Sequence, residues 1–307
     1  MDNLHYMKVI NKEVITNPIE YVSKCERMYA AYLEQIVREI AQRPTKYKIV
    51  MLSGPSSSGK TTGANKLARL FQQLGYDANV ISLDDFYRNR DEIPPGPDGE
   101  QDFEAVYALD LELIQNTLKD LIEKGATKLP YFDFTTGTRT DNVFNLTLRE
   151  GDVVIIEGLH AINPIFTQEL DSECIVKIYA STASDILDDN GQVLFSRRDV
   201  RFFRRVIRDY HFRGASVDKT FSMWPKVAQG EDKYLVPLID LADYQIDSLH
   251  PYEMCIYKDV AIKLLSELPE DSIYYYPAME LIDRLKKVTT LDKEIIPKNS
   301  LLREFVG

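Results

Sequence analysis

Apolar residues follow two alternating patterns along most of the chain. From residue 47, near-continuous apolar runs alternate with segments whose apolar residues recur at helical spacing. Such runs suit strands that are covered on both faces, as in a parallel sheet between helices. The predicted strands are 47–53, 78–83, 152–158, 174–180 and 244–247, and the predicted helices are 60–74, 105–124 and 198–212. The pattern therefore predicts an α/β fold with a doubly wound, mostly parallel sheet.

Three segments depart from this alternation. Asn17 and Pro18 resemble a helix N-cap followed by proline at the first helical position, and helical spacing then continues to Pro44. We expect this single amphipathic helix to pack on the core. Residues 127–148 predict a β-hairpin with TTGTRTDN at its tip. The pattern beyond residue 250 is helical. The predicted divisions are an N-terminal helical extension (1–46), a core (47–248) and a C-terminal helical extension (249–307).

Composition narrows the class of protein. The chain has 307 residues, 44% of them hydrophobic, which suffices for a sizeable core. The net charge of −11 argues against a duplex nucleic-acid binder. Three widely separated cysteines without a CxxC motif favour thiols in a reducing cytosol over a disulfide or metal framework. No signal-like segment or run of 18 apolar residues is present, so we expect a cytoplasmic protein that does not enter membranes.

The stretch GPSSSGKTT at 54–62 carries the strongest chemical signal. It matches G-x-x-x-x-G-K-[ST] and lies between a predicted strand and a predicted helix, the context that a phosphate-binding loop requires. Its glycines let backbone N–H groups point at phosphate oxygens, and the helix N-terminus favours anions. Lys60 would reach the β- and γ-phosphates, and the Thr61 hydroxyl would ligate Mg²⁺. The predicted nucleotide-binding residues are Gly54, Pro55, Ser56, Ser57, Ser58, Gly59, Lys60, Thr61 and Thr62.

Acidic residues stand at the ends of two predicted strands, at the same edge of the sheet. Asp84 and Asp85 come at the end of the strand 78–83, and one of them could accept the proton of an acceptor hydroxyl and help hold Mg²⁺. Periodicity does not tell which carboxylate points inward, and an Asp pair that only caps the next turn is the alternative. Glu157 closes the apolar run DVVIIEG, a Walker-B-like place from which a carboxylate binds Mg²⁺ directly or through water.

Seven arginines crowd into positions 197–213 of this acidic chain. A basic helix is ordinarily a solvated face. Here only Asp199 and Asp209 are local partners, so we expect the cations to gather around an anion. The interpretation that explains the cluster better is a lid whose arginines close on a transferring phosphoryl group.

The stretches GPSSSGKTT, ISLDDFYR, PYFDF, IIEGLHA and RRVIRDYHFRG together resemble the uridine kinase/phosphoribulokinase-like family in order and spacing. The resemblance covers about residues 47–248 and is closest to bacterial uridine kinase-like nucleoside kinases, whose ending is similar to NSLLREFVG. It implies a P-loop NTPase fold of the nucleoside/NMP-kinase type. It also implies transfer of the γ-phosphoryl group of ATP or GTP, with Mg²⁺, to the 5′-hydroxyl of a nucleoside.

The resemblance assigns roles to individual residues. Asp84 would be the catalytic base, and Lys60 would hold the phosphates. Arg205, Arg208 and Arg213 match the catalytic arginines of a lid spanning 197–235. The implied acceptor-binding residues are Asp84, Tyr87, Glu104, Phe132, Gly137, Arg139, Leu159 and Arg205, and the implied metal ligands are Thr61, Asp84 and Glu157.

Three positions depart from the uridine and cytidine kinases of this family. Phe132 and Gly137 stand where those enzymes have a tyrosine and a histidine that read the pyrimidine, and Ala215 replaces a lid arginine. Another hydroxyl acceptor therefore stays open: a sugar phosphate, a pantothenate-like alcohol or a purine nucleoside. A non-catalytic nucleotide-binding regulatory module is the alternative from another class, and a homo-oligomer is compatible with either.

Overall fold

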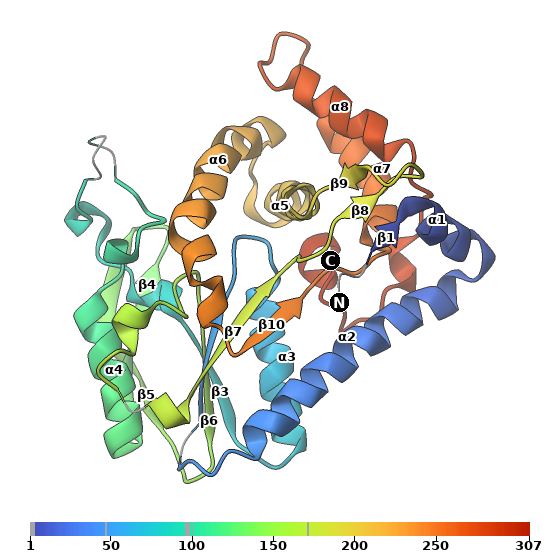
Figure 1. Cartoon of the computed structure of the whole chain (residues 1–307). Coiled ribbons are helices and arrows are strands. Elements are labelled where there is room, and N and C mark those ends of the chain that lie inside the picture. The colour runs from blue at the N-terminus through green and yellow to red at the C-terminus, as the bar shows by residue number, and fades with distance from the viewer. Residues whose placement is uncertain (1–3, 47, 96–98, 100, 171) are drawn as a thin grey trace.

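The centre of the protein is a parallel sheet. The computed structural model describes residues 4–46, 48–95, 99, 101–170 and 172–307, so the first residue of the predicted strand 47–53 lies outside the described part. The sheet has five strands in the order β10-β7-β2-β6-β3, all paired in parallel (Figure 1). The strands are β2 (Lys48–Ser53), β3 (Ala78–Ser82), β6 (Val153–Glu157), β7 (Ile175–Ser181) and β10 (Tyr244–Asp247). The predicted α/β fold is confirmed.

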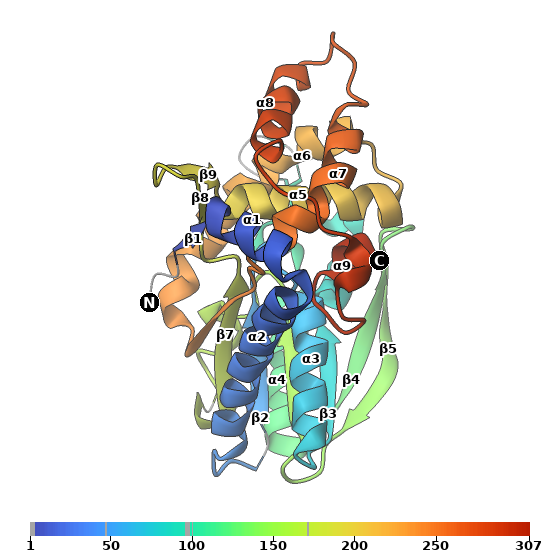
Figure 2. The same ribbon diagram turned by 90° about the vertical axis from the view of Figure 1, so that its right-hand side faces the viewer.

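Helices cover both faces of this sheet, which explains why its strands are apolar on both sides. Side chains alternate along β2, so Val50 and Leu52 join one buried cluster while Ile49 and Met51 join another. The first cluster includes α3 (Lys60–Gln73), and the second includes α4 (Leu111–Lys124). Figure 2 shows α3 on the near side of the sheet and α4 behind it.

Helix α4 is shorter than predicted. The sequence pattern placed its start at residue 105, but Val106–Ala108 form a separate 3-10 turn. The side chain of Asp110 then accepts a hydrogen bond from the Leu113 backbone N–H at 3.1 Å and caps the helix. Gly125 ends it in the left-handed conformation, with φ +67°.

The predicted hairpin is also present. Strands β4 (Ala126–Asp133) and β5 (Thr138–Thr147) pair antiparallel and form a two-stranded ribbon that stands apart from the main sheet (Figure 1). A second small sheet joins β1 (His5–Tyr6), β8 (Ile186–Leu187) and β9 (Val193–Phe195).

The N-terminal extension contains two helices rather than the single one predicted. Helix α1 (Met7–Thr16) precedes α2 (Pro18–Ala41). Asn17 occupies the N-cap position of α2, but its side chain makes no capping hydrogen bond. The buried residues of α1, Met7, Ile10 and Val14, do lie at helical spacing, but the exposed apolar residues Val9 and Ile15 obscure that period in the sequence. As expected, α2 packs on the core through α3.

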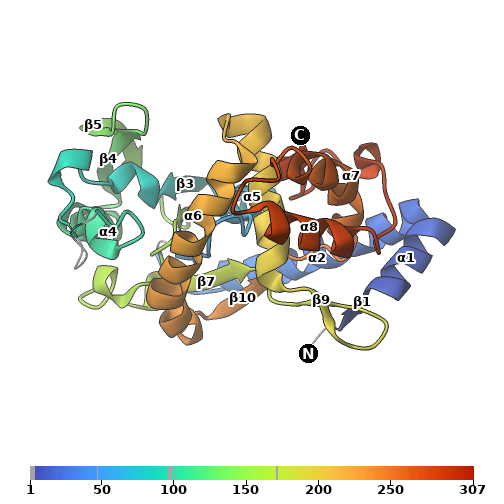
Figure 3. The same ribbon diagram turned by 90° about the horizontal axis from the view of Figure 1, so that it is seen from above.

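The rest of the chain is mostly helical. Its elements are α5 (Arg197–Arg213), α6 (Val217–Gly230), a π-helical turn (Glu231–Leu235), a 3-10 turn (Val236–Leu241), α7 (Glu253–Leu265), α8 (Tyr275–Leu285) and α9 (Arg303–Val306). Figures 1 and 2 show α5 above the carboxyl ends of the strands, and Figure 3 views the same helices from above. In the described part of the chain, no helix combines the length and the apolar character that a membrane span needs.

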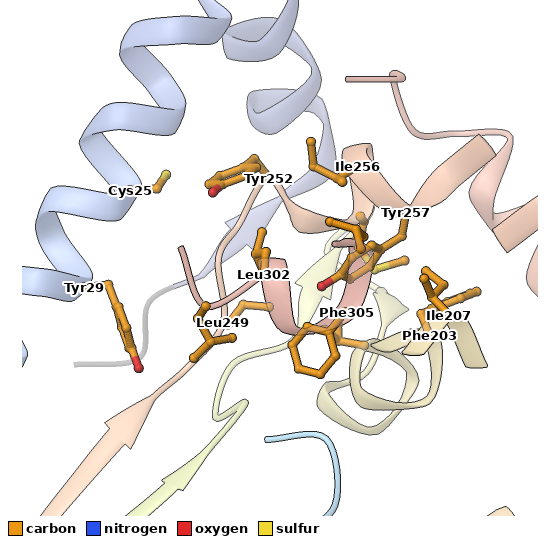
Figure 4. Close-up of a cluster of buried hydrophobic side chains, with 14 of the residues drawn as sticks. Cys25, Tyr29, Phe203, Ile207, Leu249, Tyr252, Ile256, Tyr257, Leu302 and Phe305 are labelled. Carbon is orange, nitrogen blue, oxygen red and sulfur yellow. The ribbon is translucent and has the colours of Figure 1, made fainter. Parts of the chain in front are cut away.

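The two extensions and the core share one apolar cluster. Figure 4 shows part of this cluster, which extends from Tyr29 of α2 through the C-terminal Leu302 and Phe305 to Tyr257 of α7 and Phe203 of α5. All five side chains are buried. The C-terminal helix α9 therefore packs against α5, the helix that lies above residues 54–61, while α2 joins the same cluster through α3.

Candidate phosphoryl-transfer site

The segment 54–61 has the backbone geometry of a phosphate-binding loop. It joins β2 to α3, and it contains two residues in the left-handed conformation, Ser57 (φ +60°) and Gly59 (φ +83°). A Cβ at Gly54 would lie 2.0 Å from the carbonyl oxygen of Ala180, so no larger residue fits there. The buried hydroxyls of Ser57 and Ser58 have no hydrogen-bond partner among the described residues. These polar groups and the first turn of α3 are suited to hold phosphate oxygens.

Arginines of α5 hold this loop from the other side. Arg201 and Arg204 donate to the backbone carbonyls of Ser56 and Ser57, each at 3.3 Å. Arg205 donates to the Ser56 side-chain hydroxyl at 2.8 Å. Of these three, only Arg205 was expected in the site. Arg201 and Arg204 bind the loop itself, a role that their helical spacing relative to Arg205 and Arg208 could have suggested.

The α5 arginines have protein partners beyond the two local acids, Asp199 and Asp209, so they do not gather around an anion for want of partners. Arg201 pairs with Glu231 at 2.6 Å, and Arg204 forms two hydrogen bonds with Glu253 at 2.7 and 2.8 Å. These acids lie far along the chain and were invisible to a local count. Asp199 does not neutralise the cluster, because it caps α5 and pairs with Arg284.

The alternative of a solvated basic face is also wrong for most of the helix. The side chains of Arg201, Arg204, Arg205 and Arg208 are at most 10% exposed, and only Arg213 among the predicted lid arginines is open, at 60%. Arg208 bonds to Asp209 through two nitrogens, at 2.9 and 3.0 Å. The helix is therefore a buried cationic layer beside the phosphate loop.

Glu157 and Thr61 meet at the end of β6. The Thr61 hydroxyl donates to Glu157 Oε1 at 3.3 Å, and the Ser82 hydroxyl donates to the same atom at 3.0 Å. Burial raises the pKa of Glu157 and the nearby Asp84 charge adds to this, although Lys60 opposes both. In the described part of the chain, no group of three or more His, Cys, Asp or Glu is arranged to hold a metal. The hard oxygen ligands of Thr61 and Glu157 fit Mg²⁺, which is typically held by few protein groups and by substrate phosphates.

Replacing Glu157 by Gln is expected to stabilise the metal-free protein by about 0.5–2 kcal/mol at neutral pH. The pKa of Glu157 is raised in the folded state, so its ionised form opposes folding above that pKa. The gain should shrink as the pH falls and the wild-type carboxyl takes up its proton. Urea unfolding of both proteins at pH 7 and pH 4.5 measures this. A variant that is less stable than wild type at pH 7 would contradict it.

Asp84 and Asp85 have different surroundings. The Asp85 carboxylate accepts a hydrogen bond from the Phe132 backbone N–H at 3.3 Å and so ties the 3-10 turn Leu83–Phe86 to the hairpin. The Asp84 side chain is exposed to solvent, and it follows β3 at the edge of the sheet where the segment 54–61 follows β2. The surrounding protein raises the pKa of Asp84, while the positive charge of Lys60 lowers it. Asp84 is therefore the carboxylate next to the phosphate loop.

Three aromatic rings cluster where the segment after β3 meets the hairpin. The ring centroids of Tyr87 and Phe132 lie 5.7 Å apart, and that of Phe134 lies 4.9 Å from Phe132 and 6.2 Å from Tyr87. The Tyr87 hydroxyl donates to the Phe103 carbonyl at 3.0 Å. Burial raises the pKa of Tyr87, and the charges of Asp84 and Glu104 add to that effect. The Tyr87 ring therefore packs the segment after Asp84 against the hairpin.

Glu104 closes this side next to the end of α6. A Cβ at Gly230 would lie 3.0 Å from the Glu104 Cβ, so the helix approaches closely. Burial raises the pKa of Glu104, against the opposing charges of Arg205 and Lys60. His160 Nε2 lies 2.8 Å from the Glu104 carbonyl oxygen, which is a structural hydrogen bond.

The two predicted acceptor residues on the hairpin, Gly137 and Arg139, both contact side chains from other segments. The space that a side chain at Gly137 would fill is taken by Arg90, whose Nε would lie 2.9 Å from a Cβ there. Arg90 also donates to the Phe134 carbonyl at 3.1 Å. Arg139 pairs with Asp110 at 2.9 Å and so braces the hairpin against the start of α4.

Leu159, the remaining residue of the predicted acceptor set, follows β6. Its carbonyl oxygen accepts a hydrogen bond from the hydroxyl of Ser53, the last residue of β2, at 2.5 Å. This contact fixes the turn after Glu157 beside the start of the phosphate loop.

A phosphate loop between a central parallel strand and a helix, with a carboxylate closing the neighbouring strand, defines a P-loop nucleotide-binding protein. The family model described as "Phosphoribulokinase / Uridine kinase family" matches residues 49–254, and the chain belongs to this family. Membership supports a phosphotransferase.

Individual relatives share low sequence identity with this chain. A protein named uridine kinase from Macrococcus caseolyticus is 26% identical over 200 residues, covering 65% of this chain and 87% of that protein. Its namesake from Staphylococcus aureus is 27% identical over 197 residues, covering 64% and 84%. A solved structure from Bacillus stearothermophilus, described as that of a possible uridine kinase, is 20% identical with a TM-score of 0.48, covering 72% of this chain and 98% of that one.

Proposed function

We propose that the protein transfers the γ-phosphoryl group of ATP or GTP to the 5′-hydroxyl of a nucleoside. The observation that supports this most directly is the position of Asp84. Asp84 follows β3 at the edge of the sheet where the phosphate loop follows β2, and the charge of Lys60 in that loop lowers the pKa of its carboxyl group against the effect of burial. A base in that position can serve an acceptor hydroxyl aimed at a phosphate held by the loop.

Each residue of the site has a separate role in the proposed phosphoryl transfer. Loop amides and Lys60 hold the donor phosphates, and Thr61 with Glu157 would hold Mg²⁺, which supplies positive charge at the phosphate oxygens when bound. The acceptor oxygen forms a bond to the γ-phosphorus while the bond from that phosphorus to the bridging oxygen breaks, leaving ADP or GDP. Asp84 takes the hydroxyl proton. Arg205, Arg208 and Arg213 offset the charge on the transferring group.

The acceptor side favours a nucleoside over a sugar phosphate. Glu104 and Asp84 place carboxylates there, and a phosphate-bearing acceptor would be repelled by them. Tyr87, Phe132 and Phe134 offer aromatic faces on which a planar base can stack. Arg90 fills the place of the missing side chain at Gly137 and can donate hydrogen bonds to carbonyl oxygens of a base.

An acceptor panel tests the proposal. With ATP and Mg²⁺, ADP formation is measured with uridine, cytidine, adenosine, guanosine, pantothenate and a pentose phosphate. We expect turnover with at least one nucleoside, and none with its 5′-deoxy analogue, which should act as a competitive inhibitor. Turnover of the pentose phosphate or pantothenate without any nucleoside turnover would refute the proposed acceptor class.

A further inference from the structure

The last nine residues pack directly against the phosphate loop. A Cβ at Gly59 would lie 2.6 Å from Leu301 Cδ1, so this loop position and the C-terminal segment are in contact. Leu301, Leu302 and Phe305 are completely buried. Figure 4 shows Leu302 and Phe305 inside the apolar cluster shared with α5. Residues 299–307 lie outside the part of the chain that matches the family model.

One carboxylate of this segment reaches the phosphate-binding groups. Glu304 Oε2 accepts a hydrogen bond from the Thr62 hydroxyl at 2.6 Å, and Glu304 Oε1 lies 4.0 Å from Arg208 Nη1. Thr62 belongs to the first turn of α3, where the helix favours anions. The neighbouring Thr61 instead faces Glu157. Glu304 thus places an internal anion at the end of the helix that a donor phosphate would use.

Arg208 has a closer partner than Glu304 in Asp209, a carboxylate that also pairs with Arg205 at 3.3 Å and with Arg213 at 3.6 Å. Arg208 already has two hydrogen bonds to Asp209, both shorter than its distance to Glu304. The bond from Thr62 is therefore the closest contact of the Glu304 carboxylate, and it uses a hydroxyl of the predicted nucleotide-binding stretch.

We propose that Glu304 determines the affinity for the donor by competing with its phosphates for Thr62 and Arg208. Donor binding then requires the Glu304 side chain to turn away. The movement is confined to this side chain, because the buried Leu301, Leu302 and Phe305 keep the segment in place. The Glu304 side chain is 21% exposed and has solvent to turn into. The inference rests on the proposed function only in that a nucleoside triphosphate binds the loop.

Isothermal titration calorimetry of the full chain with MgATP, without an acceptor, tests the competition. Glu304→Gln keeps the shape of the side chain and removes the charge, so we expect it to bind MgATP roughly five- to tenfold more tightly than wild type. Inorganic tripolyphosphate, which carries the charge without the nucleoside, should show the same gain. Glu294→Gln is the matched control: it removes the same charge from an exposed residue nearby and should bind as wild type does.

The outcomes separate the two claims. Equal or weaker MgATP binding by Glu304→Gln, or a gain for ATP without one for tripolyphosphate, would overturn the competition while leaving the kinase proposal intact. Absence of MgATP binding in wild type and both variants would overturn the proposed function, and the role of Glu304 with it.

Discussion

Replacing Asp84 by Asn is expected to lower kcat by roughly 10²- to 10⁴-fold, the usual contribution of a general base. The amide keeps the size of the side chain and can still accept a hydrogen bond, but it cannot take the hydroxyl proton. Because Lys60 stays in place, and Thr61 and Glu157 can still hold Mg²⁺, the variant should keep most of its affinity for MgATP. Acceptor-dependent ADP formation measures the first effect, and calorimetry measures the second.

The neighbouring carboxylate provides the control. Asp85 bonds to the Phe132 backbone rather than facing the loop, so Asp85→Asn should keep kcat within about tenfold of wild type.

The pKa of Asp84 is raised, so the acid limb of the wild-type rate profile should lie above the range of an ordinary Asp and disappear in Asp84→Asn. An Asp84→Asn enzyme with wild-type turnover would exclude Asp84 as the base.

The fold and the phosphate loop were predictable because their signals are local. Most core strands are short apolar runs, with β10 (YQID) as an exception, and the loop is a motif set by spacing. The apolar runs of β2 and β6 are buried at every position, as expected for strands covered on both faces. The start of α4 was missed because it depends on a tertiary contact. The Asp110 backbone N–H donates to the Phe86 carbonyl at 2.9 Å, and this bond holds the capping residue against the segment after β3.

The partners of the arginines could not be predicted, because they are tertiary contacts. Glu231 lies 30 residues beyond Arg201, Glu253 lies 49 beyond Arg204, and Glu304 is 242 residues from Thr62. No local pattern of charge or period encodes such distances. The acids that neutralise the arginines of α5 were therefore missed, whereas the residues that would meet a substrate, which local motifs suggest, stay a prediction.

That layer leads to the largest stability effect we expect. Arg204→Leu should lower the free energy of unfolding by about 3–5 kcal/mol, because Glu253 would be left as an unpaired charge with neither side chain exposed to solvent. Arg27→Leu provides the comparison: it breaks the pair with Glu20, whose side chains are both 62% exposed, and should cost at most about 1 kcal/mol. Urea unfolding at pH 7 measures both.

A double variant then separates stability from the support of the loop. In Arg204→Leu/Glu253→Gln the buried charge is gone, while the amide oxygen can still accept the hydrogen bond from the His250 N–H, which is 2.9 Å long in the wild type. Most of the lost stability should therefore return. The bond from Arg204 to the Ser57 carbonyl is still missing, so MgATP binding should stay weaker than in wild type. If Arg204→Leu costs no more stability than Arg27→Leu, the buried pair does not stabilise the fold. If the double variant recovers full MgATP affinity, the bond from Arg204 does not shape the phosphate loop.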